Sequence, residues 1–245
     1  VAESCVRTIY GRGFAGYRDA MRHLVNRSAV PVESLRYGPH PDNIADLRSG
    51  AGRGLVVLVH GGLWRHEYER DTTESLAVDL AQRGFDSLNI EYRRLGDGGG
   101  WPGSAHDVLT CLDTLPTLGF DTAKVVSHSA GSLLAMWAAS RSRIVVGLHI
   151  ALAPIFDIAS TAGNDDPGAR EATFLLEAGA PPTMSPDGVL TTISHGDRDQ
   201  IVPIDRSVGF ATAHGIEVNR SVTDHFALLD PTKSEWHWAV GRLES

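Results

Sequence analysis

The chain of 245 residues has few cysteines, few basic residues and no long hydrophobic run. Its two cysteines, Cys5 and Cys111, are too few and too far apart in sequence to form a disulfide framework or a metal site. Lys and Arg total 22 against 30 Asp and Glu, and the formal net charge of −8 argues against binding to nucleic acid or to an anionic membrane surface. No apolar run approaches the length of a membrane span. The sequence therefore predicts neither a nucleic-acid partner nor a membrane partner.

What the chain does contain is ordinary for a globular protein. Hydrophobic residues make up 42% and charged residues 21%, and the length fits one large α/β domain or two small ones. Because no linker or repeat interrupts the chain, we expect a single domain over residues 1–245. No secretory signal is visible, although a leader could have been removed before Val1, and a reducing cytoplasm is the expected compartment. Cys111 falls in an apolar helical pattern and is expected to be a buried free thiol, and a homodimer is compatible with the sequence.

The hydrophobic pattern alternates between two periods from residue 54 onward. Strands are expected at 54–60, 85–92, 124–128, 143–152, 189–196 and 216–222. Helices are expected at 72–83, 105–118, 132–140, 208–214 and 232–243. This alternation predicts the α/β class, with a mostly parallel sheet and helices on both of its faces.

Three further segments have weaker patterns. Apolar residues between Phe14 and Val25 suggest one helix, and residues 34–37 and 44–47 are expected to form an antiparallel edge of the sheet. Residues 154–187 are rich in Pro, Gly and Asp and contain one helical piece at 172–178. We expect this lid segment, residues 154–187, to form a small lid or an active-site loop.

One serine stands where a strand is expected to turn into a helix. Val125–Ala139 reads VVSHSAGSLLAMWAA, with Ser129 in the turn. In such a turn the hydroxyl lies at the tip of a strand, and the N–H of Ala130 would face a developing oxyanion at a helix N-terminus. The turn is tight, so Ser127 and Gly131 must be small, as they are. A serine that only caps the helix is the alternative.

A second loop supplies glycines after another expected strand. His60–Trp64 reads HGGLW. Two consecutive glycines allow a close approach of the backbone, and the N–H groups of Gly62 and Leu63 suit the second half of an oxyanion hole. A plain Gly-Gly turn is the alternative. His60 itself is expected to be a structural hydrogen-bonding residue and not a base.

Two later loops hold a carboxylate and a histidine. His195–Pro203 reads HGDRDQIVP and contains Asp197 and Asp199, either of which could orient a histidine; aspartates that cap a turn are the alternative. His225 follows the last expected strand and is the only one of the 11 histidines in a loop after this acid. Oxyanion loop, serine, acid and histidine therefore follow one another along the chain, an order that differs from those of chymotrypsin and subtilisin.

These motifs in this order resemble the α/β-hydrolase superfamily over essentially the whole chain. The resemblance implies the α/β-hydrolase fold and places the acid three residues after the glycine of HGDRD, at Asp199. HGGLW is similar to the His-Gly-Gly-x-Trp signature of kynurenine formamidases and related bacterial esterases. The family's usual turn has glycine at the position of Ser127 and often at that of Ser132, and we expect the exchange of one small residue for another to preserve the turn.

The resemblance also implies acyl transfer through a covalent intermediate. Ser129 would be the nucleophile, His225 the base and Asp199 the group that orients the base, without a metal or an organic cofactor. Four functions stay open: a carboxylesterase acting on a small ester or amide, an arylformamidase of the N-formylkynurenine type, a biosynthetic acyltransferase or tailoring enzyme, and, least favoured, a domain that only binds a ligand.

Aromatic residues near these loops are candidates for substrate contact. The three candidates are Trp64, Trp101 and Phe226. They could line a pocket for an apolar or aryl group, and packing against the lid segment is the alternative.

Overall fold

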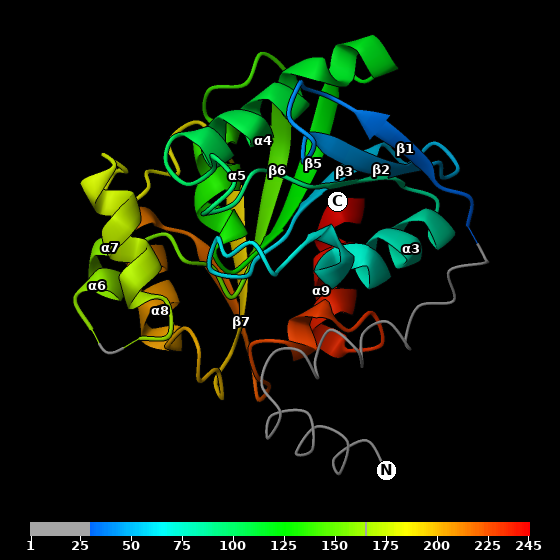
Figure 1. Ribbon diagram of the computed structural model, residues 1–245. Coiled ribbons are helices and arrows are strands. Elements are labelled where there is room, and N and C mark those ends of the chain that lie inside the picture. Colours follow the sequence, from blue (N-terminus) through cyan, green and yellow to red (C-terminus); the bar gives the residue numbers. More distant parts are fainter. Residues whose placement is uncertain (1–29, 165) are drawn as a thin grey trace.

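An eight-stranded sheet forms the centre of the computed structural model, which describes residues 30–164 and 166–245 (Figure 1). The strands are β1 (Glu33–Arg36), β2 (Ile44–Arg48), β3 (Leu55–Val59), β4 (Asp86–Ile90), β5 (Thr122–His128), β6 (Val145–Leu152), β7 (Thr191–Gly196) and β8 (Glu217–Ser221). Their order in the sheet is β1-β2-β4-β3-β5-β6-β7-β8. β1–β2 and β2–β4 pair antiparallel and the other pairs are parallel, so both the mostly parallel sheet and its antiparallel edge are confirmed.

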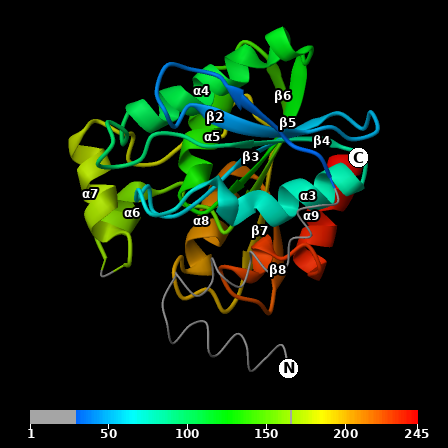
Figure 2. The ribbon, with the colours of Figure 1, turned by 45° about the vertical axis from the view of Figure 1, so that its right-hand side comes forward.

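Helices cover both faces of this sheet (Figure 2). They are α3 (Glu74–Gln82), α4 (Gly103–Thr114), α5 (Gly131–Ala139), α6 (Ile158–Ala162), α7 (Ala169–Glu177), α8 (Ile204–His214) and α9 (Ser234–Glu244). α4, α5 and α8 contribute to one hydrophobic cluster, and α3 and α9 contribute to a second cluster on the opposite face. The strands between them therefore have their side chains buried on both sides.

β3 shows why the inner strands form where they do. All five residues of its sequence LVVLV are buried, and side chains alternate along a strand. Val57 and Val59 belong to the cluster with α5, whereas Val56 and Leu58 belong to the cluster with α3. Each fully buried side chain of this kind stabilises the fold by about 1.5–3 kcal/mol. A continuous apolar run is therefore the pattern that this position demands.

Several expected elements have different bounds in the structure, and the clearest differences concern helices. The helix expected at 208–214 begins at Ile204, directly after Pro203, and Asp205 lies in its first turn without capping it. The helix expected at 72–83 begins as a 3-10 turn at Arg70–Thr73. The lid segment contains two helices instead of one, because Asp157 caps α6 by accepting a hydrogen bond from the N–H of Ser160 at 2.9 Å.

The expectations about the cysteines, the N-terminal helix and membrane spans can also be compared with the structure. Cys111 is a buried free thiol, as predicted, whereas Cys5 and the helix expected between Phe14 and Val25 lie outside the described residues. None of the helices in the described part of the chain is both long and apolar enough to cross a membrane.

Candidate active site

The turn between β5 and α5 holds Ser129 in a left-handed conformation, with a φ of 51°. Such a φ strains any residue other than glycine and persists only where the surroundings enforce it. Here the N–H of Ser129 donates to the carbonyl of Leu152 at 2.9 Å, and its carbonyl accepts from the N–H of Ile155 at 3.1 Å. A Cβ at Gly131 would lie 2.2 Å from the carbonyl oxygen of His60. The turn is thus clamped between β3 and β6.

The two serines that replace glycine in this turn form a buried hydrogen-bonded chain. The hydroxyl of Ser127 lies 2.8 Å from that of Ser132 and 2.7 Å from Nε2 of His149 on β6. Burial lowers the pKa of His149 to about 3, so the ring is neutral near pH 7. Its Nδ1 has no hydrogen-bond partner among the described residues, which favours the proton on Nε2, donated to Ser127. Both hydroxyls therefore have a structural role behind the turn.

The backbone of the HGGLW loop lies directly beside Ser129. A Cβ at Gly61 would stand 2.9 Å from the Cβ of Ser129, so only glycine permits this approach. The next residues are in left-handed conformations, with φ of 109° at Gly62 and 54° at Leu63. Within the described part of the chain, no group accepts a hydrogen bond from the N–H of Leu63 or of Ala130. Unpaired backbone donors are thus present in this loop and directly after the serine.

His60 anchors this loop from behind. Its Nε2 lies 2.9 Å from Oε1 of Glu91, and its ring stacks on Tyr92 with centroids 4.3 Å apart. The hydroxyl of Tyr92 donates to the carbonyl of His60 at 2.9 Å. Burial alone would raise the pKa of Glu91, but the charges of His60 and Arg94 outweigh burial and lower it. The expected structural role of His60 is confirmed.

Asp199 and His225 form a buried pair. Oδ2 of Asp199 accepts from Nδ1 of His225 at 2.6 Å, and its Oδ1 accepts from the N–H groups of Ile201 and Val202 at 2.8 and 2.9 Å. Burial alone would raise the pKa of this carboxyl, but hydrogen bonds from His195 and His225 hold it well below its usual range. The carboxylate is therefore ionised, and it fixes the His225 proton on Nδ1, leaving Nε2 for another partner.

Asp197, the other carboxylate considered, points elsewhere. It forms an ion pair with Arg220 at 3.0 Å, and both side chains are exposed. It is thus a surface residue of the β7–β8 edge, whereas Asp199 faces the histidine.

His128 links Ser129 to the histidine loop. Its ring contacts that of His225 with centroids 4.6 Å apart, and its Nε2 lies 3.1 Å from the carbonyl oxygen of His225. Burial and the neighbouring His225 lower the pKa of His128 well below its usual value. Ser129 and His225 are each 2% exposed, and no hydrogen bond to the Ser129 hydroxyl occurs among the described residues. The resting site is closed, with the hydroxyl unengaged.

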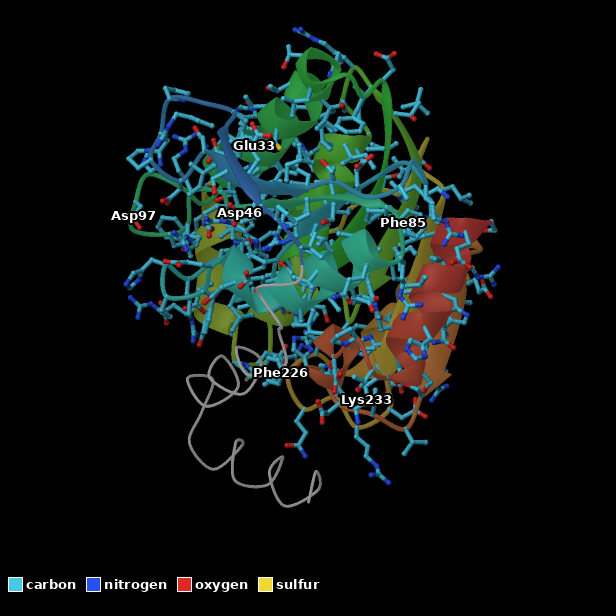
Figure 3. The ribbon with its side chains drawn as sticks, turned by 90° about the vertical axis from the view of Figure 1, so that its right-hand side faces the viewer. Glu33, Asp46, Phe85, Asp97, Phe226 and Lys233 are labelled. Carbon is cyan, nitrogen blue, oxygen red and sulfur yellow. The ribbon has the colours of Figure 1, made fainter. Side chains whose placement is uncertain are left out.

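The three aromatic candidates for substrate contact lie in different environments. Trp64 is fully buried in the core, and its Nε1 has no partner among the described residues. Trp101 is partly buried and meets Trp137 edge-on at 5.4 Å. Phe226 meets the ring of His225 edge-on at 5.1 Å, on the segment that leads to α9 (Figure 3). Of the three, Phe226 alone makes a ring contact with a residue of the candidate triad.

The lid segment is attached to the HGGLW loop. Oε1 of Glu171 on α7 accepts from Nε of Arg65 at 2.7 Å, and Nη2 of Arg65 donates to the carbonyl of Pro167 at 2.9 Å. A Cβ at Gly168 would lie 2.7 Å from the side chain of Leu63. On the other side, Arg206 pairs with Asp166. The lid segment therefore contacts the residue whose N–H is available beside Ser129.

Sequence reasoning missed three residues of this arrangement: His128, His149 and His195. All three belong to strands, where a histidine is usually a satisfied core residue. The signal for His195 was its position four residues before Asp199, but the contact depends on how the loop after β7 folds back. In the described part of the chain, no group of three or more His, Cys, Asp or Glu side chains is arranged to hold a metal ion.

Comparison with solved structures identifies the fold. The chain is similar to esterase B from Lactobacillus Rhamnosis (HN001), with a TM-score of 0.76 and 18% identity over 98% of this chain and 93% of that one. It is also similar to an esterase/lipase from an uncultured bacterium (TM-score 0.71, 19% identity, 93% and 87% covered). A third similar structure is esterase LipW from Mycobacterium marinum (TM-score 0.67, 19% identity, 100% and 89% covered). No protein-family model and no curated protein matches the sequence. The predicted α/β-hydrolase fold is confirmed.

Proposed function

We propose that this chain, which has the α/β-hydrolase fold, is a serine hydrolase that cleaves an ester or amide of a small apolar or aryl substrate. The observation that carries the proposal is the 2.6 Å pair of Asp199 and His225 beside a strained turn that holds Ser129. A left-handed serine and a buried ionised acid are both expensive to maintain, and such features concentrate at functional sites.

The mechanism follows from which atoms carry protons. With the proton of His225 on Nδ1, Nε2 takes the proton of Ser129 as its oxygen attacks the carbonyl carbon, and Asp199 stabilises the resulting imidazolium. The N–H groups of Ala130 and of Gly62 or Leu63 hold the oxyanion. The imidazolium then gives its proton to the leaving group. In the second half of the reaction His225 takes a proton from water as the water attacks the acyl carbon, and it returns this proton to the Ser129 oxygen as the acid product leaves.

The substrate class rests on the surroundings of the triad. Phe226 lies against His225, Leu63 of the HGGLW loop packs against the lid segment, and His128 is held neutral. An apolar acyl or aryl group suits these neighbours better than a charged one, since no ligand charge would find a partner among them. Trp64 and Trp101 remain candidate contacts for a substrate that displaces the lid segment.

Two other functions use the same triad. The HGGLW sequence resembles the signature of kynurenine formamidases. Comparing the hydrolysis of N-formylkynurenine with that of short p-nitrophenyl esters tests whether this chain is an arylformamidase. An acyltransferase would form a product only when an amine, alcohol or thiol acceptor is present. These two functions are alternatives to the hydrolysis of a small ester or amide.

The decisive experiment compares wild type, Ser129→Ala and Ser140→Ala on a panel of p-nitrophenyl esters, aryl amides and N-formylkynurenine. We expect Ser129→Ala to lower kcat by about 10⁴- to 10⁶-fold and to abolish labelling by a fluorophosphonate. Ser140→Ala is the matched control, because Ser140 is an exposed residue directly after α5. Wild-type rates or labelling in the folded Ser129→Ala variant would refute the proposal.

A further inference from the structure

His195 makes a contact that the mechanism above does not use. Its Nε2 lies 3.0 Å from Oδ2 of Asp199, the same oxygen that accepts from His225 at 2.6 Å. The side chains of His195 and Asp199 are both fully buried. One carboxylate oxygen therefore accepts from two imidazoles in an environment from which water is excluded.

The surroundings of His195 determine where its proton lies. Nε2 faces two acceptors, Oδ2 of Asp199 and the carbonyl oxygen of Val202, each at 3.0 Å. Neither acceptor carries a hydrogen, because the carboxyl is ionised, so Nε2 must carry it. Nδ1 lies 2.7 Å from the hydroxyl of Ser207 on α8, which donates to it when the ring is neutral.

We propose that His195 is a positioning residue that shares Oδ2 of Asp199 with His225 and thereby weakens the hydrogen bond between this carboxylate and the base. The proposal deepens the proposed function and rests on it, since it takes His225 as the base. A second donor stabilises the negative charge on Asp199 and makes it a weaker acceptor for His225. The carboxylate then stabilises the protonated form of His225 less strongly, so the base stays unprotonated to lower pH.

Two other groups near the pair must be considered. His128 from β5 contacts the ring of His225, but it is held neutral by burial. Asp224, next to His225, caps the following turn by accepting from the N–H groups of Phe226 and Ala227, both at 3.0 Å. Neither group bonds to Asp199, so His195 is the side chain through which the carboxylate can be altered separately.

The test uses two amides that imitate different nitrogens of the imidazole. In His195→Gln the side-chain amide reaches the place of Nε2 and can still donate to Asp199, whereas in His195→Asn it reaches only the place of Nδ1. We measure the pH midpoint at which His225 takes up a proton by NMR of labelled histidines, assigned by the signal lost in His225→Gln. We expect the midpoint to rise by about 0.5–1 pH unit in His195→Asn and to stay near the wild-type value in His195→Gln.

Ser207→Ala is the second control, because it removes the partner of Nδ1 and leaves the donor to Asp199 in place. It should leave the midpoint unchanged. Equal midpoints in all four proteins, or equal shifts in the Asn and Gln variants, would overturn the proposal. If His195→Asn does not fold, the nitrogen shifts of wild-type His195 decide: a proton on Nε2 supports the proposal, and a proton on Nδ1 alone refutes it.

These measurements need no substrate. A protein that hydrolyses neither an ester nor an amide would refute the proposed function, and the shared hydrogen bond would still be measurable in it. Conversely, an active hydrolase whose His225 midpoint ignores residue 195 would refute only this inference. In an active protein, the acid limb of the kcat/KM profile should move with the NMR midpoint in His195→Asn and stay in place in His195→Gln.

Discussion

A single buried histidine, His149, makes the stability of the fold depend on pH. The pKa of His149 is lowered by burial to about 3, whereas an unfolded histidine has a pKa of roughly 6.5. Between these values the unfolded chain binds a proton at this residue and the folded chain does not. The free energy of unfolding must therefore fall as pH falls below about 6.5, and His149 alone accounts for about 2 kcal/mol between pH 7 and pH 5.

We expect His149→Gln to remove this part of the pH dependence. Its amide can still donate to the hydroxyl of Ser127, but it does not titrate. Urea unfolding at pH 7 and pH 5 measures the loss, which should be about 2 kcal/mol smaller in the variant than in wild type. His237→Gln is the control, because His237 is exposed on α9 and should change nothing. The same pH dependence in His149→Gln and wild type would show that residue 149 is not the source.

The roles of single residues were predictable to different degrees. Loop position and chain order indicated Ser129, Asp199 and His225, because a triad needs these residue types at strand ends. The contact of Ser127 with His149 was not indicated, because it depends on which strands lie side by side, and the contact of Asp199 with His195 was not indicated, because it depends on how the loop after β7 folds back. β5 neighbours β6, and that pairing, which no local pattern encodes, brings His149 to the turn.

At the scale of elements, two glycines in helices have opposite constraints. Gly131 begins α5, and a Cβ there would lie 2.2 Å from a backbone oxygen of the loop after β3. Gly209 lies inside α8, is exposed and has nothing within 4 Å of an added Cβ. The first glycine is required by close contact between elements, and the second only weakens its helix.

Alanine substitutions should separate these cases. We expect Gly131→Ala to lower the free energy of unfolding by about 3 kcal/mol, because backbone atoms cannot move aside as a flexible side chain can. Gly209→Ala should raise it by about 0.5–1 kcal/mol through helix propensity. Urea unfolding of both variants against wild type measures this, and a tolerated Gly131→Ala would contradict the tight packing of α5 against the end of β3.

Element boundaries were less predictable than element types. The continuous apolar run of β3 and the helical stripe of α4 are strong signals, and both elements appear where expected. The start of α8 was missed because Pro203, which fixes it, precedes the first apolar residue of the helical pattern. α6 was missed because it is five residues long, too short for a helical period to be visible.

At the scale of the whole molecule, the lid segment is joined to the HGGLW loop. Ser129 and His225 are almost completely buried, so we infer that a substrate enters only when the lid segment moves. The ion pair of Arg65 with Glu171 opposes that movement. A partly exposed pair of this kind contributes about 0.5–1 kcal/mol.

We therefore expect Glu171→Ala to raise the rate of labelling by a bulky fluorophosphonate by about two- to fivefold. Stopped labelling reactions at several probe concentrations measure this rate. The matched control is Arg220→Ala, which breaks the exposed pair with Asp197 on the β7–β8 edge and should leave labelling unchanged. Slower or unchanged labelling in Glu171→Ala would mean that the lid segment does not limit access.

The hydrogen bond from His149 to Ser127 has a consequence for anyone who would move this turn into another protein. A search for the sequence Gly-x-Ser-x-Gly does not find this turn, because its first residue is Ser127. A graft of residues 127–131 alone would carry the hydroxyl of Ser127 without the imidazole of His149. Ser127 and His149 instead form a transferable unit drawn from two strands. A scaffold that receives one must receive the other, or return the first position of the turn to glycine.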